Sequence, residues 1–118
     1  MGLDMYLYQK NTHEVAYWRK ANAIHVWIIN KTGAIDNCTP IYISKQLLIQ
    51  LRDDCKKVLE ENNAEYALEL LPPTNGFFFG SYELDNWYWE NIKETVTKLN
   101  QIIDESIDDQ EFEYQASW

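Results

Sequence analysis

The chain has 118 residues, of which 46% are hydrophobic and 25% charged, and its formal net charge is −9. A chain of this size and composition can close one hydrophobic core, so we expect a single domain over residues 1–118. No apolar run reaches the roughly 18 residues that a membrane span needs, and residues 1–4 do not open a secretion signal. We therefore expect a cytoplasmic protein without a membrane partner. The low glycine and proline content excludes a disordered chain.

The titratable residues do not form any familiar catalytic or metal-binding motif. Cys38 and Cys55 lack the spacing of a zinc site, and two cysteines do not make a disulfide framework. Cys55 falls on an apolar helical stripe, which favours core packing over a nucleophile. His13 and His25 belong to no metal-ligand pattern. We predict no metal, no cofactor and no catalytic residue, and an enzyme is the less favoured class.

The first part of the chain predicts a strand followed by a long helix. Apolar and polar residues alternate over residues 3–8, as in a half-buried strand. Asn11 followed by Glu14 resembles a capping box and predicts a helix over residues 12–31, with Gly33 as its stop. Apolar residues lie around most of this helix, so we expect it at the centre of the fold.

The middle of the chain predicts a short strand and a second helix. Pro40 leads into an extended segment over 41–43, and Ser44 is a typical N-cap for a helix ending near residues 62–63. Residues 64–71 can add two further helical turns. The apolar run 77–79 is interpreted as a buried strand, with an apolar ligand or partner patch as the alternative.

The last part predicts a third long helix and a final strand. Asp85 is its expected cap, and residues 112–118 alternate like the first strand. The apolar stripe of the helix consists of Tyr88, Ile92, Val96, Leu99 and Ile103. All segments together predict an α+β fold in which three helices pack on a small, mostly antiparallel sheet.

A polar and aromatic cluster in the first expected helix is the candidate ligand site. An arginine fork, an indole plane and an amide suit a phosphate with a stacked base. In that interpretation Arg19 and Lys20 hold the phosphates, while Ser81 and Tyr82 complete the wall. Trp18 or Trp27 would stack on the base, and Asn22 and His25 would form hydrogen bonds with its edge. The alternative is core packing, with Arg19 paired to an acid of the last third.

Acidic residues concentrate in the last third of the chain. Residues 81–118 carry ten acids and two bases. This density argues against direct DNA binding. The segment is either a solvated face or a surface that docks on a basic partner. The candidate partner-binding residues are Asp104, Glu105, Asp108, Asp109, Glu111 and Glu113.

Five segments carry a resemblance that covers nearly the whole chain: 1–7 (MGLDMYL), 17–27 (YWRKAN, then IH and W), 70–72 (LLP), 76–81 (GFFFGS) and 117–118 (SW). On these segments the chain resembles a family of small phage and prophage proteins of unknown function. It departs from the family pattern at residues 82–85, which are not carried over. The resemblance implies a small accessory protein in a bacterial cytoplasm that modifies host physiology or blunts host defences.

Residues and resemblance together predict a phage-encoded, non-enzymatic accessory protein that antagonises host defence. It would do so by sequestering a small anionic ligand such as a signalling nucleotide. A homo-oligomer with the pocket near a subunit interface is a natural extension. The alternative is an acidic inhibitor that docks on the basic, nucleic-acid-binding surface of a host enzyme. A nucleotide-processing enzyme would differ from the first hypothesis only by turnover.

Overall fold

The computed structural model describes residues 3–9, 14–19, 21–33, 40–71 and 86–117. These residues form an α+β fold, as predicted, with an antiparallel four-stranded sheet. The described elements are β1 (Asp4–Gln9), β2 (Glu14–Arg19), α1 (Asn22–Thr32), β3 (Ile41–Ser44), α2 (Lys45–Glu61), α3 (Ala64–Leu70), α4 (Asn86–Glu105) and β4 (Glu111–Ser117). The described residues form four helices, whereas three were predicted. The additional helix, α3, corresponds to the two helical turns expected at residues 64–71. The expected cap Asp85 and the apolar run 77–79 lie outside the described residues.

The sheet has the strand order β2-β1-β4-β3, and each neighbouring pair is antiparallel. In the centre, Asp4 of β1 pairs with Ser117 of β4. On its other side Asp4 pairs with Arg19 of β2. The first and last strands of the sequence are therefore neighbours in the middle of the sheet.

Strand alternation separates a buried and an open side of the sheet. Along β4, Phe112, Tyr114 and Ala116 are buried, while the residues between them are half-buried or exposed. Along β1, Met5 and Leu7 are buried. The predicted alternation of the first and last strands is confirmed, because one side faces the helices and the other faces solvent.

The prediction of one helix over residues 12–31 is wrong for its first half. Residues 14–19 form β2, which pairs with β1, and α1 begins only at Asn22. Ala16 and Trp18 are buried while Tyr17 and Arg19 are exposed, which is the period of two of a strand. Pairing with β1 therefore overrides the capping-box signal. The predicted stop is confirmed: Gly33 adopts φ +68°, and its N–H donates to the Ile29 carbonyl.

The predicted boundaries of α2 are confirmed by its caps. The Ser44 hydroxyl accepts from the Leu47 N–H at 3.1 Å, and Asn62 ends the helix in the left-handed region. In α4, Tyr88, Ile92 and Leu99 of the predicted stripe are buried, and Val96 and Ile103 are partly buried. The amphipathic pattern thus places both helices correctly against the core.

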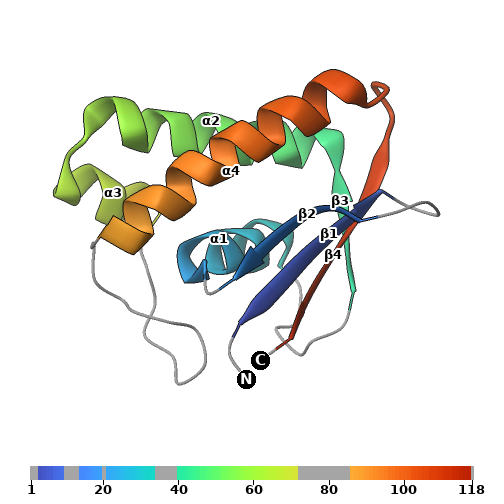
Figure 1. Cartoon of the computed structure of the whole chain (residues 1–118), viewed down its shortest axis with the longest axis horizontal. Coiled ribbons are helices and arrows are strands. Elements are labelled where there is room, and N and C mark those ends of the chain that lie inside the picture. The colour runs from blue at the N-terminus through green and yellow to red at the C-terminus, as the bar shows by residue number, and fades with distance from the viewer. Residues whose placement is uncertain (1–2, 10–13, 20, 34–39, 72–85, 118) are drawn as a thin grey trace.

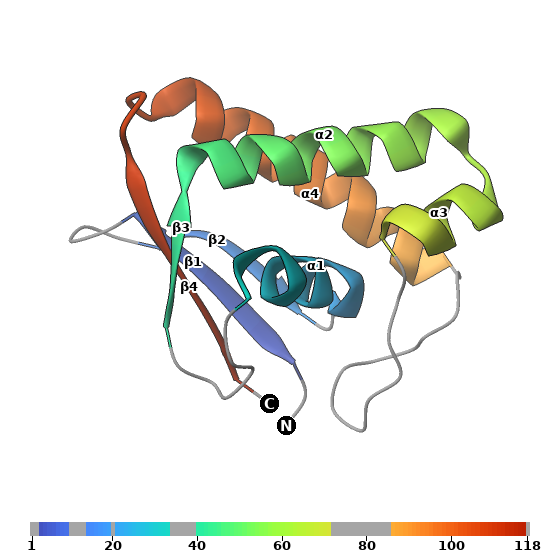
Figure 2. The same cartoon turned by 180° about the vertical axis from the view of Figure 1, so that it is seen from behind.

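The helices lie on one side of the sheet (Figures 1 and 2). α2 and α4 run side by side, and α1 lies between this pair and the strands. Side-chain hydrogen bonds join these elements: Trp18 Nε1 of β2 donates to Thr95 Oγ1 of α4, and Trp27 Nε1 of α1 donates to Asp54 of α2. None of the described helices is long and apolar enough to cross a membrane.

Candidate functional site

The structure places the predicted aromatic and amide ligands in the core. Trp18, Asn22, His25 and Trp27 are each at least nine-tenths buried. His25 Nδ1 lies 2.6 Å from the Tyr114 hydroxyl, and its ring is only 1% exposed. The indole N–H groups of Trp18 and Trp27 donate to protein side chains at 2.8 Å each. These polar atoms therefore hold the helices and the sheet together inside the core.

Arg19 lies on the opposite side of the sheet from Trp18, because neighbouring residues of a strand point to opposite faces. It is exposed and stands across from Asp4 in the register. The structure therefore does not bring Arg19 together with the buried indoles. The other three candidates, Lys20, Ser81 and Tyr82, lie outside the described residues.

The open side of the sheet carries a group of tyrosines. Tyr6 contacts Tyr17 with ring centroids 5.1 Å apart, and it stacks on Tyr8 at 6.3 Å. Tyr42 on β3 is 55% exposed. We call this side the tyrosine face; its members are Asp4, Tyr6, Tyr8, Glu14, Tyr17, Arg19, Tyr42, Glu111, Glu113 and Gln115.

Acids and tyrosines alternate in one row across all four strands. Tyr8 of β1 pairs with Glu14 of β2 on one side and with Glu113 of β4 on the other. Glu113 in turn pairs with Tyr42 of β3. Residues directly opposite each other in a sheet lie within side-chain contact distance. The row therefore presents two aromatic rings and two carboxylates on one surface.

Hydrogen bonds between side chains hold parts of the tyrosine face in place. The Tyr17 hydroxyl donates to Asp4 Oδ1 at 2.7 Å, and the Tyr42 hydroxyl donates to Glu111 Oε1 at 3.3 Å. The hydrogen bond to Asp4 raises the pKa of Tyr17 above its ordinary value, because the bond favours the protonated phenol. Tyr17 thus stays neutral beside the carboxylate.

The predicted acidic residues lie on the tyrosine face, in the turn before β4 and at the end of α4. Glu111 and Glu113 belong to the face itself, while Asp108 and Asp109 are exposed in the preceding turn. Asp104 and Glu105 are exposed at the end of α4. The described part of the tyrosine face carries four carboxylates and one guanidinium, so its electrostatic potential favours cations.

Two observations concern metal binding and the cysteine among the described residues. They contain no group of three or more histidine, cysteine or acidic residues placed to hold a metal. Cys55 is fully buried, and this burial raises the pKa of its thiol, which opposes thiolate formation. The expectation that Cys55 is a core residue is confirmed.

Comparison with known proteins does not assign this chain to a family. No protein-family model, no curated protein and no solved structure matches this chain. The candidate site therefore stands on its geometry. The tyrosines of the open face were missed at the sequence level, although Tyr6 and Tyr8 alternate with buried residues of the first strand.

Proposed function

We propose that this chain is a non-enzymatic binding protein whose tyrosine face docks on a basic surface of another protein. The observation that carries the proposal is the row of alternating acids and tyrosines that crosses all four strands. Tyrosine is enriched in protein interfaces because its ring buries apolar area while its hydroxyl finds a partner. Carboxylates beside such rings pair with arginine or lysine.

Charge favours a basic protein over other partners. Nucleic acid would be repelled, since the described residues of the face carry four carboxylates and one guanidinium, that of Arg19. A small anion would meet the same repulsion on this face, and small-anion sequestration by the buried cluster stays a prediction. The described helices leave the tyrosine face uncovered (Figure 2).

The acids beyond the face would act at long range. Asp104, Asp108 and Asp109 lie outside the row but extend the same negative potential. Charges on the rim of an interface mainly steer the encounter and raise the association rate. In the same proposal the partner is a host enzyme with a basic, nucleic-acid-binding surface, which the acidic residues would complement. The resemblance to phage proteins suggests only that the enzyme belongs to a host. The protein would then compete with the nucleic acid for the enzyme's basic surface.

The test uses purified, basic, nucleic-acid-binding enzymes of a bacterial host as probes on immobilised protein. We expect at least one enzyme to bind and to be displaced by duplex DNA. Glu113→Lys should weaken this binding at least about tenfold, because it reverses a charge in the centre of the row. The matched control Glu60→Lys reverses an exposed acid on α2 and should bind like the wild type.

Two results would contradict the proposal. One is equal affinity of the Glu113→Lys variant and the wild type for the probe. The other is simultaneous binding of DNA and this protein to the enzyme without competition. A thermal melt of each variant distinguishes a lost surface from a lost fold.

A further inference from the structure

The tyrosine face brings flat aromatic rings and a carboxylate together on neighbouring strands. The rings of Tyr6 and Tyr8 on β1 lie 6.3 Å apart, and their planes differ by only 22°. Glu113 of β4 stands directly opposite Tyr8 in the register. Neighbouring strands are about 4.8 Å apart, so a cation resting on the Tyr8 ring also reaches the Glu113 carboxylate.

The Tyr6 ring is also held from the side of β2. Tyr17 lies 5.1 Å from Tyr6 between ring centroids, and its hydroxyl donates to Asp4 Oδ1 at 2.7 Å. This hydrogen bond fixes the Tyr17 ring before any partner arrives. A surface that is ordered in advance loses less conformational entropy on binding. The three rings therefore form a prearranged aromatic surface.

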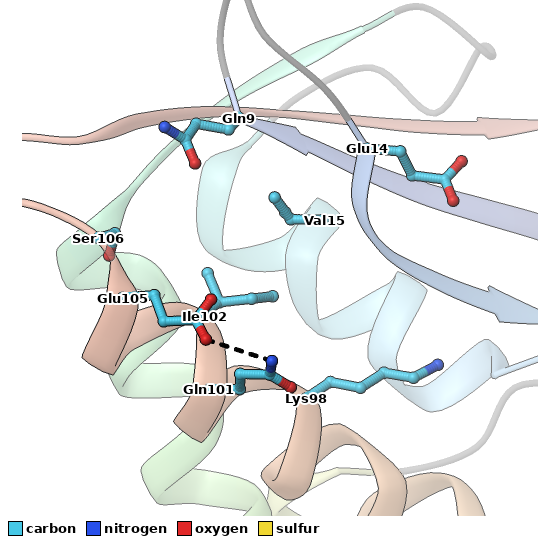
Figure 3. Close-up of a pocket in the computed structure, with 8 residues that line it drawn as sticks. All are labelled: Gln9, Glu14, Val15, Lys98, Gln101, Ile102, Glu105 and Ser106. Carbon is cyan, nitrogen blue, oxygen red and sulfur yellow. Dashed lines mark hydrogen bonds between the residues drawn. The ribbon is translucent and has the colours of Figure 1, made fainter.

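The same combination of ring and carboxylate already holds a cation inside this molecule. Lys98 Nζ lies 5.3 Å from the centre of the Trp18 ring and 2.6 Å from Glu94 Oε1. The face of an aromatic ring is electron-rich and attracts such a charge. Lys98 lines the hollow between the strands and α4, where Figure 3 shows Glu14 pointing away from Glu105. A ring beside a carboxylate is thus a working cation site in this fold.

The chemistry of the two basic side chains decides which cation fits the open rings better. A guanidinium group is planar and weakly hydrated, so it can stack on a ring while its N–H groups reach a carboxylate from the edge of the plane. An ammonium group is a strongly hydrated point charge and cannot stack. The nearly parallel rings of Tyr6 and Tyr8, with Glu113 at their side, match the flat group.

We infer that the tyrosine face selects arginine over lysine in the protein that docks on it. Arginine side chains of the partner would stack on Tyr6 and Tyr8 and donate to Glu113. The occupant is therefore an arginine-bearing segment of a protein. This inference rests on the proposed function, because it names the side chains by which the basic partner is recognised.

The experiment measures the binding of three capped pentapeptides to the full-length protein by isothermal titration calorimetry. The peptides alternate glycine with arginine, lysine or citrulline, and citrulline keeps the planar end group without its charge. We expect the arginine peptide to bind at least about fivefold more tightly than the lysine peptide, because only the guanidinium stacks. The citrulline peptide should not bind measurably. Backbone amide shifts of Tyr6, Tyr8 and Glu113 in NMR spectra should locate the arginine peptide.

Variants separate the ring from the charge. Tyr8→Leu keeps an apolar side chain but removes the ring, so the preference for arginine should shrink toward equal affinity. Glu113→Gln should weaken both charged peptides, because each loses a carboxylate partner. The matched control Tyr66→Leu makes the same change at a half-buried tyrosine of α3 and should leave both affinities unchanged. If a thermal melt shows that Tyr8→Leu unfolds, Tyr6→Leu takes its place.

The outcomes distinguish this inference from the proposed function. Equal affinities of the arginine and lysine peptides, or equal losses of both in Tyr8→Leu, would overturn arginine selection and leave docking on a basic surface standing. Tight binding of the citrulline peptide, binding of no peptide, or amide shifts confined to another part of the protein would overturn it too. Competition between this protein and DNA for a basic enzyme decides the proposed function separately.

Discussion

The two sides of the sheet use aromatic residues in opposite ways. On the helix side, Trp18 and Tyr114 are buried, and their polar atoms bond to Thr95 and His25. On the other side, Tyr17 and Tyr42 are exposed. Trp18 and Tyr17 are neighbours in the sequence, so one strand supplies both kinds of residue. The aromatic content of a sequence therefore indicates core or interface only once the side of each strand is known.

Of the substitutions on the two sides of the sheet, we expect Trp18→Ala to lower the stability most. Trp18→Ala removes a buried indole and its hydrogen bond to Thr95. The free energy of unfolding should fall by about 3–5 kcal/mol, as for other buried large-to-small changes. Urea denaturation followed by circular dichroism measures this loss. A loss below about 1 kcal/mol would mean that Trp18 does not hold the helix layer to the sheet.

Alkaline pH should lower the stability of the fold through two buried groups, Cys55 and Tyr88. Burial raises the pKa of Cys55 and of Tyr88 above their ordinary values of 9.0 and 10.0. The unfolded chain therefore ionises first, so the stabilisation is full below about pH 9 and is lost as the pH rises further. We expect a loss of about 1–2 kcal/mol at pH 10 relative to pH 8. Urea denaturation at both pH values checks it, and Cys55→Ala should flatten the dependence.

Tyr114→Phe tests the buried hydroxyl alone. It removes the 2.6 Å contact with His25 Nδ1 and leaves the ring in place. Stability should fall by about 1 kcal/mol, the usual net contribution of a buried hydrogen bond. The matched control is Tyr42→Phe on the open side, which should change stability by less than about 0.5 kcal/mol. Equal effects of both substitutions would erase the distinction between the two sides.

The smallest effect on stability is expected on the tyrosine face. Tyr42→Ala removes a ring that is 55% exposed, so the free energy of unfolding should change by less than about 0.5 kcal/mol. Affinity for a basic partner should nevertheless fall at least about tenfold, because an aromatic anchor is lost. Denaturation and binding measurements on the same sample separate the two quantities. Reduced stability with unchanged affinity would make Tyr42 a structural residue.

Local sequence patterns predicted the elements whose ends and faces depend on residues close together in the sequence. Alternation gave the first and last strands, and Ser44 and Gly33 marked helix ends that the structure confirms. Residues 14–19 were assigned to a helix because their pairing with β1 is not visible in the segment itself. The spread of apolar residues around the expected helix was the available signal against it.

The candidate site was harder to predict than the fold. Glu111 and Glu113 were singled out by charge density, and the strand order then joins them to the tyrosines. Trp18 and His25 were predicted as ligands because their burial depends on how β2 and α1 pack against the other elements. That choice is made by contacts distant in sequence, which no local pattern encodes.

The pairing of β1 with β4 has a consequence for biosynthesis. The ladder from Asp4 to Ser117 closes the middle of the sheet, and β3 joins only through β4. A nascent chain still lacking β4 would leave β1 with an unsatisfied edge. The middle of the sheet therefore closes only once β4 has been synthesised. Contacts so distant in sequence also slow folding, so this small protein should fold late and slowly for its size.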